Sequence, residues 1–304
     1  MLRVFMAADP IQFFNRYTGR VETEQVYGEA FMRLIYGNPL GIAVLHTVAK
    51  RALFSRWYGW RMGRSVSRGK VAPFIRNYGL DPAEFADAPE SFRTFNEFFY
   101  RKLKPSARPV DAAPDVAVFP ADGRHLALQD VSTAEGFYVK GQRMSLADLF
   151  ADAALANEFA GGTIIFSRLC PVDYHRFHFP VSGIAPAPRL INGPLFSVSP
   201  IALRRNLGYL CENKRSLSVI AAEGFGRVVT LEVGATNVGS WDYTFTAGSR
   251  VVKGQEKGFF KFGGSLTITV FRKGVMKLAD DLAANGARQR EVYAKIGDRM
   301  GTLM

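Results

Sequence analysis

Two of the four histidines stand close together in the hexapeptide Asp173–His178, which reads DYHRFH. Imidazole is the side chain best suited to proton transfer near neutral pH, and a neighbouring carboxylate can orient it. In a strand His175 and His178 would face opposite sides, whereas in a turn they could converge. The same residues could bind a metal, but no third ligand follows at a suitable spacing. The segment is therefore a candidate functional site, with a structural role as the equal alternative.

Two other segments contain residues that could take part in such chemistry. Asp122 lies between a proline and a glycine in Phe119–Arg124 (FPADGR), a pattern that by itself predicts a β-turn. Ser265 follows two glycines in Phe262–Leu266 (FGGSL), and glycines can leave a peptide carbonyl accessible to a nearby hydroxyl. The alternative is a turn that enters a strand. A nucleophile elbow is excluded, because that motif needs a following helix and a strand pattern follows here.

The secondary structure that must position these residues is predicted to be mostly strands in the later part of the chain and mostly helices in the first 100 residues. Short apolar runs at 163–166, 228–233 and 266–271 predict strands, and the last run alternates apolar residues with threonines. Many short strands without regular intervening helices favour a β-barrel or sandwich. The first 100 residues or so are predicted to be helical. Further helices are expected at Ser91–Leu103, Ser145–Phe159 and in the tail after Lys277.

The fold class predicted from these patterns is α+β. A helical, membrane-associating region (residues 1–104) precedes a β-rich barrel or sandwich catalytic domain (residues 105–304). The boundary is set at the segment 105–114, which is rich in proline and alanine.

The balance of charge indicates an anionic partner, since 39 basic residues against 27 acidic ones give a net charge of +12. Lys50–Lys70 has no acidic residue and interleaves lysine and arginine with tryptophan and phenylalanine. This composition suits the headgroup layer of an anionic membrane, although a solvated helix face and single-stranded nucleic acid are alternatives. The longest uncharged stretch, 34–49, is short and broken for a membrane span. A peripheral location on the cytoplasmic face is therefore expected, and Cys170 and Cys211 are expected to be reduced thiols.

Taken together, these segments resemble phosphatidylserine decarboxylase proenzymes, and the resemblance spans nearly the whole chain. The segment around the two histidines is the most specific part. The matching segments are Phe14–Gly19 (FNRYTG), Pro39–Gly41 (PLG), Phe95–Phe99 (FNEFF), Arg101–Pro105 (RKLKP), Pro171–His178 (PVDYHRFH), Pro180–Gly183 (PVSG), Gly193–Val198 (GPLFSV), Val233–Ala235 (VGA) and Val238–Ser240 (VGS).

The resemblance implies a triad, similar to that of serine proteases, that acts once on its own chain. Asp122 would orient His178, and His178 would take the proton of Ser265, which attacks the carbonyl of Gly264. Cleavage would give a β chain, 1–264, and an α chain, 265–304. Family members commonly have Leu-Gly-Ser-Thr at this point. Leu266 therefore lacks the hydroxyl that the family's threonine offers for local hydrogen bonding.

The resemblance also implies the chemistry after cleavage. Ser265 would become a pyruvoyl group that forms a Schiff base with phosphatidylserine, and loss of CO2 would yield phosphatidylethanolamine. His175 is the candidate for the proton transfer, with Asp173 as its orienting partner, and no metal or dissociable cofactor is required.

The expected partners are phosphatidylserine, an anionic membrane surface and the two cleaved chains as a heterodimer. The sequence leaves open whether the chain forms a homo-oligomer, and nucleic acid is not expected as a partner. Two alternatives remain at this point: a serine hydrolase that acts at a lipid surface, and a nonenzymatic membrane-binding module.

Overall fold

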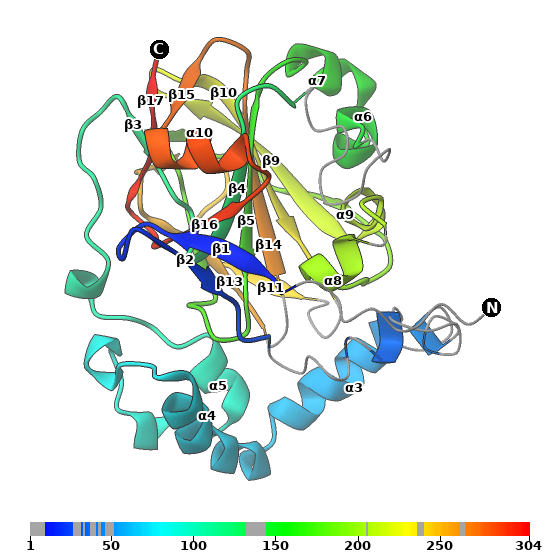
Figure 1. The fold of residues 1–304 in the computed structure, drawn as a ribbon, viewed down its shortest axis with the longest axis vertical. Coiled ribbons are helices and arrows are strands. Elements are labelled where there is room, and N and C mark those ends of the chain that lie inside the picture. Colours follow the sequence, from blue (N-terminus) through cyan, green and yellow to red (C-terminus); the bar gives the residue numbers. More distant parts are fainter. Residues whose placement is uncertain are drawn as a thin grey trace.

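A computed structural model describes residues 10–26, 32, 34–36, 41, 44–45, 52–131, 144–204, 206–235, 240–261 and 265–304. The fold is mixed α and β, with a large sheet at its centre (Figure 1). The strands are β1 (Gln12–Asn15), β2 (Arg20–Thr23), β3 (Val116–Val118), β4 (Gly123–Leu128), β5 (Thr163–Leu169), β6 (Arg176–His178), β7 (Gly183–Ile184), β8 (Arg189–Ile191), β9 (Arg215–Ala222), β10 (Gly226–Val233), β11 (Trp241–Tyr243), β12 (Arg250–Val251), β13 (Glu256–Phe260), β14 (Ser265–Phe271), β15 (Met276–Leu278), β16 (Glu291–Ala294) and β17 (Arg299–Leu303).

The helices are short, and several of them begin at a side-chain cap. Thr94, Ser145 and Asp152 each accept a hydrogen bond from a backbone N–H of the first turn that follows them. The α-helices are α3 (Ala52–Met62), α4 (Val71–Tyr78), α5 (Phe95–Phe99), α6 (Leu146–Phe150), α7 (Ala153–Glu158), α8 (Pro200–Leu203), α9 (Tyr209–Glu212) and α10 (Asp280–Gly286), and the 3-10 helices are η2 (Ser65–Lys70), η3 (Pro82–Glu84), η4 (Pro89–Ser91) and η5 (Pro105–Ala107).

The central sheet has 11 strands, in the order β12-β7-β9-β10-β14-β5-β4-β16-β1-β2, with β8 also paired to β9. All of its pairs are antiparallel except β1 with β16. The end strands β12 and β2 do not pair with each other in the part of the chain that the structure describes, so no closed barrel forms. Two three-stranded sheets, β11-β13-β6 and β15-β17-β3, accompany it.

Apolar and polar side chains alternate along β14, so the two faces of the central sheet pack against different parts of the protein. Leu266, Ile268 and Val270 point to one face, where they join a buried cluster with residues of α6, α7, α8 and α9. These helices lie on one side of the sheet in Figure 1. Toward the other face, Phe271 joins a second cluster that includes residues of β15, β17 and α10. Ser265, Thr267 and Thr269 share the face of Phe271 and are buried. One face is therefore apolar, and the other is polar near the start of β14.

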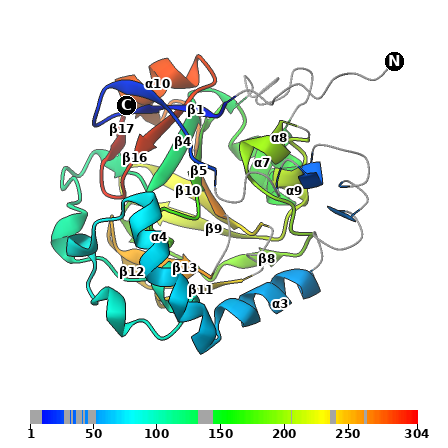
Figure 2. The ribbon, with the colours of Figure 1, turned by 60° about the horizontal axis from the view of Figure 1, so that its bottom comes forward.

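The segment from α3 to α5 carries its own aromatic cluster. Phe74, Phe95 and Phe98 pack edge to face or tilted at its centre. Figure 1 shows α4 and α5 below the sheets, and Figure 2, with the bottom turned forward, shows α4 in front of them; in both views α3 leads away along the lower edge. Arg176 of β6 donates from Nε to the carbonyl of Tyr100 at 2.9 Å, which ties this segment to the strand that ends at His178.

Several predicted elements are confirmed, and others are wrong. The strands at 163–166, 228–233 and 266–271 correspond to β5, β10 and β14. Residues 12–23 were expected to be helical but form the hairpin β1–β2, because β1 pairs with β16 at the other end of the chain. The tail after Lys277 is helical only over α10 and then forms β16 and β17.

Two predicted helices are shorter than expected. The helix expected at Ser145–Phe159 divides into α6 and α7 at Ala151, which adopts a positive φ of 47°. The helix expected at Ser91–Leu103 is confined to α5. Of the predicted barrel or sandwich, no closed barrel forms among the described strands, which make one large open sheet and two small ones.

Candidate active site

Ser265 is the first residue of β14 and is completely buried. It lies opposite Leu169 at the end of β5, and its hydroxyl has no hydrogen-bond partner among the described residues. A buried hydroxyl without a partner costs free energy, so it is seldom kept without a role. Gly264, its partner at the expected cleavage bond, lies outside the described residues.

Both ends of the segment that contains the expected cleavage bond are tied to one turn. On one side of that segment, the N–H of Phe260 in β13 donates to the carbonyl of His175 at 2.9 Å. On the other side, Ser265 pairs with Leu169. The turn Cys170–His175 connects these two anchor points, so the fold brings the histidine segment beside the serine.

His175 is completely buried and has a defined orientation. Its Nδ1 lies 3.0 Å from the carbonyl oxygen of Asp173, and its ring centroid is 3.8 Å from that of Phe99 in α5. A carbonyl oxygen only accepts, so Nδ1 must carry the proton and Nε2 is the basic nitrogen. The aromatic N-terminal segment therefore helps to hold the candidate proton-transfer group.

Asp173 contacts His175 through its main chain rather than through its carboxylate. The carboxylate accepts from Arg124 Nη1 at 2.7 Å and from the N–H of Cys170 at 2.7 Å. Asp173 therefore fixes the turn and offers its carbonyl to the imidazole. Asp173 can therefore orient His175 through its backbone carbonyl and not through its carboxylate.

Asp122 and Ser265 lie on opposite sides of β5. Gly123 follows Asp122 and sits so close to β5 that a Cβ there would come within 2.4 Å of the carbonyl oxygen of Arg168. Since Gly123 and Ser265 both flank the end of β5, their backbones are separated by two strand spacings, about 10 Å. Side chains that extend toward each other from backbones this far apart leave room for an imidazole between the carboxylate and the hydroxyl.

His178 lies beside the Asp122 segment but makes no hydrogen bond to its carboxylate in this structure. Its N–H donates to the carbonyl of Pro120 at 2.7 Å, whereas its buried Nδ1 has no partner among the described residues. Burial, assisted by the positive charge of Arg176, lowers the pKa of His178 to about 3. The ring is therefore neutral at physiological pH, the form that a general base needs.

The carboxylate of Asp122 is held by other groups. Arg108 contacts both of its oxygens, at 3.0 and 2.9 Å from Nε and at 2.6 Å from Nη2. The N–H of Ile296 donates to Oδ1 at 2.9 Å. The structure thus brings Asp122, His178 and Ser265 into one region, but it does not join the first two by a hydrogen bond.

A buried ion pair occupies the same face of the sheet as Ser265. Lys257 Nζ donates to Glu232 Oε1 at 2.7 Å and to Thr230 Oγ1 at 2.8 Å, and Tyr243 donates to Glu232 Oε2 at 2.7 Å. Glu232 lies opposite Thr267, two residues after Ser265. Neither this pair nor Arg108 was singled out by sequence reasoning, because nothing near each residue in the chain shows that it is buried or what it contacts.

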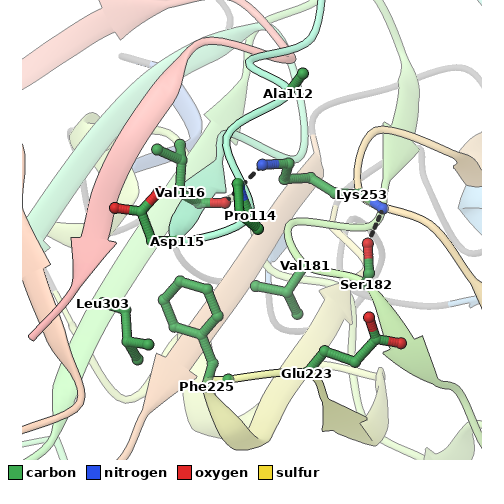
Figure 3. Close-up of a pocket in the computed structure, with 11 residues that line it drawn as sticks. Ala112, Pro114, Asp115, Val116, Val181, Ser182, Glu223, Phe225, Lys253 and Leu303 are labelled. Atoms are coloured by element: carbon green, nitrogen blue, oxygen red, sulfur yellow. Dashed lines mark hydrogen bonds between the residues drawn. The ribbon is translucent and has the colours of Figure 1, made fainter.

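One cavity of about 440 Å³ lies away from these residues (Figure 3). It is lined by residues that include Glu223, Phe225, Lys253 and Leu303. Glu223 and Phe225 belong to the turn between β9 and β10, at the opposite end of these strands from the residues that pair beside Ser265. Lys253 Nζ already donates to the carbonyls of Ala113 and Val116. The cavity therefore does not belong to the candidate active site.

No group of three or more histidine, cysteine, aspartate or glutamate side chains is arranged to hold a metal ion within the described ranges. No helix in the same ranges is long and apolar enough to cross a membrane.

Comparison with known proteins agrees with the motifs in this site. The family model described as phosphatidylserine decarboxylase matches residues 95–302. Proteins named phosphatidylserine decarboxylase proenzyme from Fusobacterium nucleatum and Desulfitobacterium hafniense are each 40% identical, over 97% and 96% of this chain and 99% and 98% of theirs. The protein of the same name from Chlamydia caviae is 42% identical over 96% of this chain and 97% of its own.

Proposed function

Since the chain belongs to the phosphatidylserine decarboxylase family and removes CO2 from phosphatidylserine, we propose that it does so with a pyruvoyl group made from its own Ser265. The observation that carries this proposal is the buried Ser265 hydroxyl, which has no partner among the described residues and opens a well-patterned strand directly after two glycines. A serine kept only for structure at this position would be expected to form a hydrogen bond.

Self-cleavage needs a base, an orienting carboxylate and the serine. His178, neutral because burial lowers its pKa to about 3, would accept the proton of the Ser265 hydroxyl. Asp122 would stabilise the imidazolium that results. The serine oxygen would bond to the carbonyl carbon of Gly264 as the peptide C–N bond breaks, which leaves an ester. Loss of the 1–264 chain as a carboxylate, followed by uptake of water and release of ammonia, would leave a ketone at residue 265.

The residues around Ser265 fit a pyruvoyl group at that position. The group would supply an electron-accepting carbonyl for the amine of the substrate. His175 presents a basic Nε2, since Nδ1 donates to Asp173, and it would deliver a proton to the substrate carbon after CO2 leaves. Asp173 and Arg124 hold the turn that carries His175.

We also infer that the N-terminal segment docks on an anionic membrane. Trp57 and Trp60 of α3 are 48% and 60% exposed, and Val66 is 88% exposed. Arg61 and Arg64 lie over the two indole rings, at 5.8 and 4.8 Å. Exposed indoles with arginines beside them suit the headgroup layer.

A flotation assay with anionic and neutral vesicles tests this docking. The double variant Trp57→Ala/Trp60→Ala is compared with Tyr17→Ala, which removes a similarly exposed aromatic side chain from the turn between β1 and β2. Flotation that is unchanged in the double variant would contradict the docking.

The mass of the purified protein tests the main proposal. Self-cleavage gives fragments 1–264 and 265–304, and the smaller one should react with a hydrazide that labels ketones. A serine hydrolase that acts at a lipid surface would instead remain one chain of 33.7 kDa. Decarboxylation by an uncut chain with an unmodified serine at 265 would overturn the proposal.

A further inference from the structure

Arg108 holds the carboxylate that the proposed triad needs. Its side chain is 12% exposed, that of Asp122 is 3% exposed, and its guanidinium contacts both carboxylate oxygens. Paired in this way, Asp122 is less able to stabilise a positive charge on a histidine, because the guanidinium already neutralises it.

The ring nitrogen Nδ1 of His178 lacks a hydrogen bond among the described residues. This nitrogen is buried, although the N–H of His178 binds Pro120, two residues before Asp122. The other charged or titratable groups around it are Arg176 on its own strand, Glu256 opposite it on β13, and Tyr174, whose ring centroid is 6.0 Å away. No side chain of these three residues hydrogen-bonds Nδ1, and of the three only the main chain of Arg176 acts on the ring as a hydrogen-bond partner.

Arg108 has a second carboxylate within reach. Its Nη2 lies 3.0 Å from Glu84 Oε2, and Glu84 is more exposed than Asp122, at 30%. Glu84 belongs to η3, in the segment that also carries α4 and α5. The guanidinium is therefore shared between a carboxylate of the N-terminal segment and one of the active site.

We propose that Arg108 is a latch on self-cleavage: while it binds Asp122 it withholds that carboxylate from His178, and when it binds Glu84 alone the triad closes. This inference rests on the proposed triad. Arg108 acts through Asp122 and is thus a positioning residue. Arg108 is not needed to hold the 105–115 segment in place, since Asp111 in the same segment pairs with Arg299 at 3.1 Å.

Two substitutions should change the cleavage rate in opposite directions. Arg108→Gln removes the competing charge, so its self-cleavage should be about tenfold faster than that of the parent chain, the size expected for one charge-assisted hydrogen bond. Glu84→Gln removes the alternative partner and should slow cleavage. Arg299→Gln, which loosens the same segment without touching Asp122, should cleave at the parent rate. Full-length chains made by cell-free synthesis are sampled over time, and the fragments are resolved on denaturing gels.

The outcomes separate the latch from its alternatives. Slower cleavage in both Arg108→Gln and Glu84→Gln would mean that the ion pairs merely support the site, and the latch would be wrong. If Arg108→Gln fails to fold, as shown by thermal unfolding, Glu84→Gln carries the test, and an unchanged or faster rate overturns the latch. Arg108→Lys, which keeps a cation, should stay close to the parent rate.

The pH profile gives a readout that a purely structural role would not change. In Arg108→Gln, pairing with Asp122 should raise the pKa of His178 from about 3 toward its usual value, so the rate should fall as the pH drops below about 6. The parent rate should stay flat over this interval. A profile that is identical in both chains counts against the latch.

Asp122→Asn distinguishes failure of the latch from failure of the triad. If this variant cleaves at the parent rate, the triad itself is wrong. If it is blocked while Arg108→Gln is no faster than the parent, only the latch is wrong.

Discussion

His125 and His178 are both buried, and burial lowers the pKa of each to about 3. Around His125 every polar group is satisfied: Ser167 donates to Nδ1 at 2.9 Å, and Nε2 donates to the carbonyl of Ala294 at 3.2 Å. Around His178 and Ser265, Nδ1 and the hydroxyl both lack partners among the described residues. Burial alone therefore does not distinguish the two histidines, whereas the unsatisfied ring nitrogen of His178 does.

The largest effect is expected from Ser265→Ala. Without the hydroxyl no ester can form, so the purified protein should be a single uncut chain by intact mass. Ser218→Ala is the matched control, because Ser218 is also buried on this sheet and also lacks a partner in the described ranges. A cut Ser265→Ala chain would refute the site. A blocked Ser218→Ala chain would show that the missing partner does not single out Ser265.

His178→Ala should slow self-cleavage by roughly 10⁶-fold, the cost of losing the histidine of a serine-protease triad. His125→Asn removes the satisfied histidine and should leave the rate of cleavage unchanged. The time course of fragment formation in cell-free synthesis measures both. Normal maturation of His178→Ala would remove it from the triad.

His175→Ala should mature normally but decarboxylate about 10²-fold more slowly, because the proton-transfer group is lost while the triad stays intact. Two measurements separate these effects: CO2 release, and hydrazide labelling of the small fragment. Wild-type turnover would show that His175 is structural.

The two buried histidines should make stability depend on pH. Their folded pKa of about 3 lies below the ordinary value of 6.5, so the unfolded chain binds more protons between these two values. The contribution of these histidines to the free energy of unfolding should be fully present above pH 6.5. It should be lost on acidification toward pH 3, by at most ~1.4 kcal/mol per pH unit for each histidine. Urea unfolding of the uncut Ser265→Ala chain measures the slope. Adding His125→Asn should remove the share of one histidine, and an unchanged slope would contradict the burial argument.

The smallest effect is expected at the cavity of Figure 3. Lys253→Met removes hydrogen bonds to two carbonyls and should cost about 1–3 kcal/mol of unfolding free energy. Cleavage and decarboxylation should not change, because the cavity lies at the far end of the sheet. Impaired cleavage in a variant that is folded normally would show that the two ends are coupled.

Local patterns predicted the strands near the active site better than the rest of the fold. In β14 the threonines alternate with Leu266, Ile268 and Val270. The alternation in the sequence matches the structure because these three apolar side chains pack against helices on one face of the sheet. The hairpin β1–β2 was missed, since β1 is fixed by pairing with β16 some 280 residues along the chain. The division between α6 and α7 depends on the positive φ of Ala151, a residue that by itself favours helix.

The sequence by itself determined the reactive groups available to this protein: a serine after two glycines, two histidines in one short segment, and an aspartate before a glycine. It also determined the resemblance to the family. These are properties of residue type and order. Only the tertiary structure decided which of these groups have partners. Arg108 holds Asp122, the carbonyl of Asp173 orients His175, and Lys257 is buried against Glu232. Such pairings depend on contacts between residues far apart in the chain, which local patterns do not record.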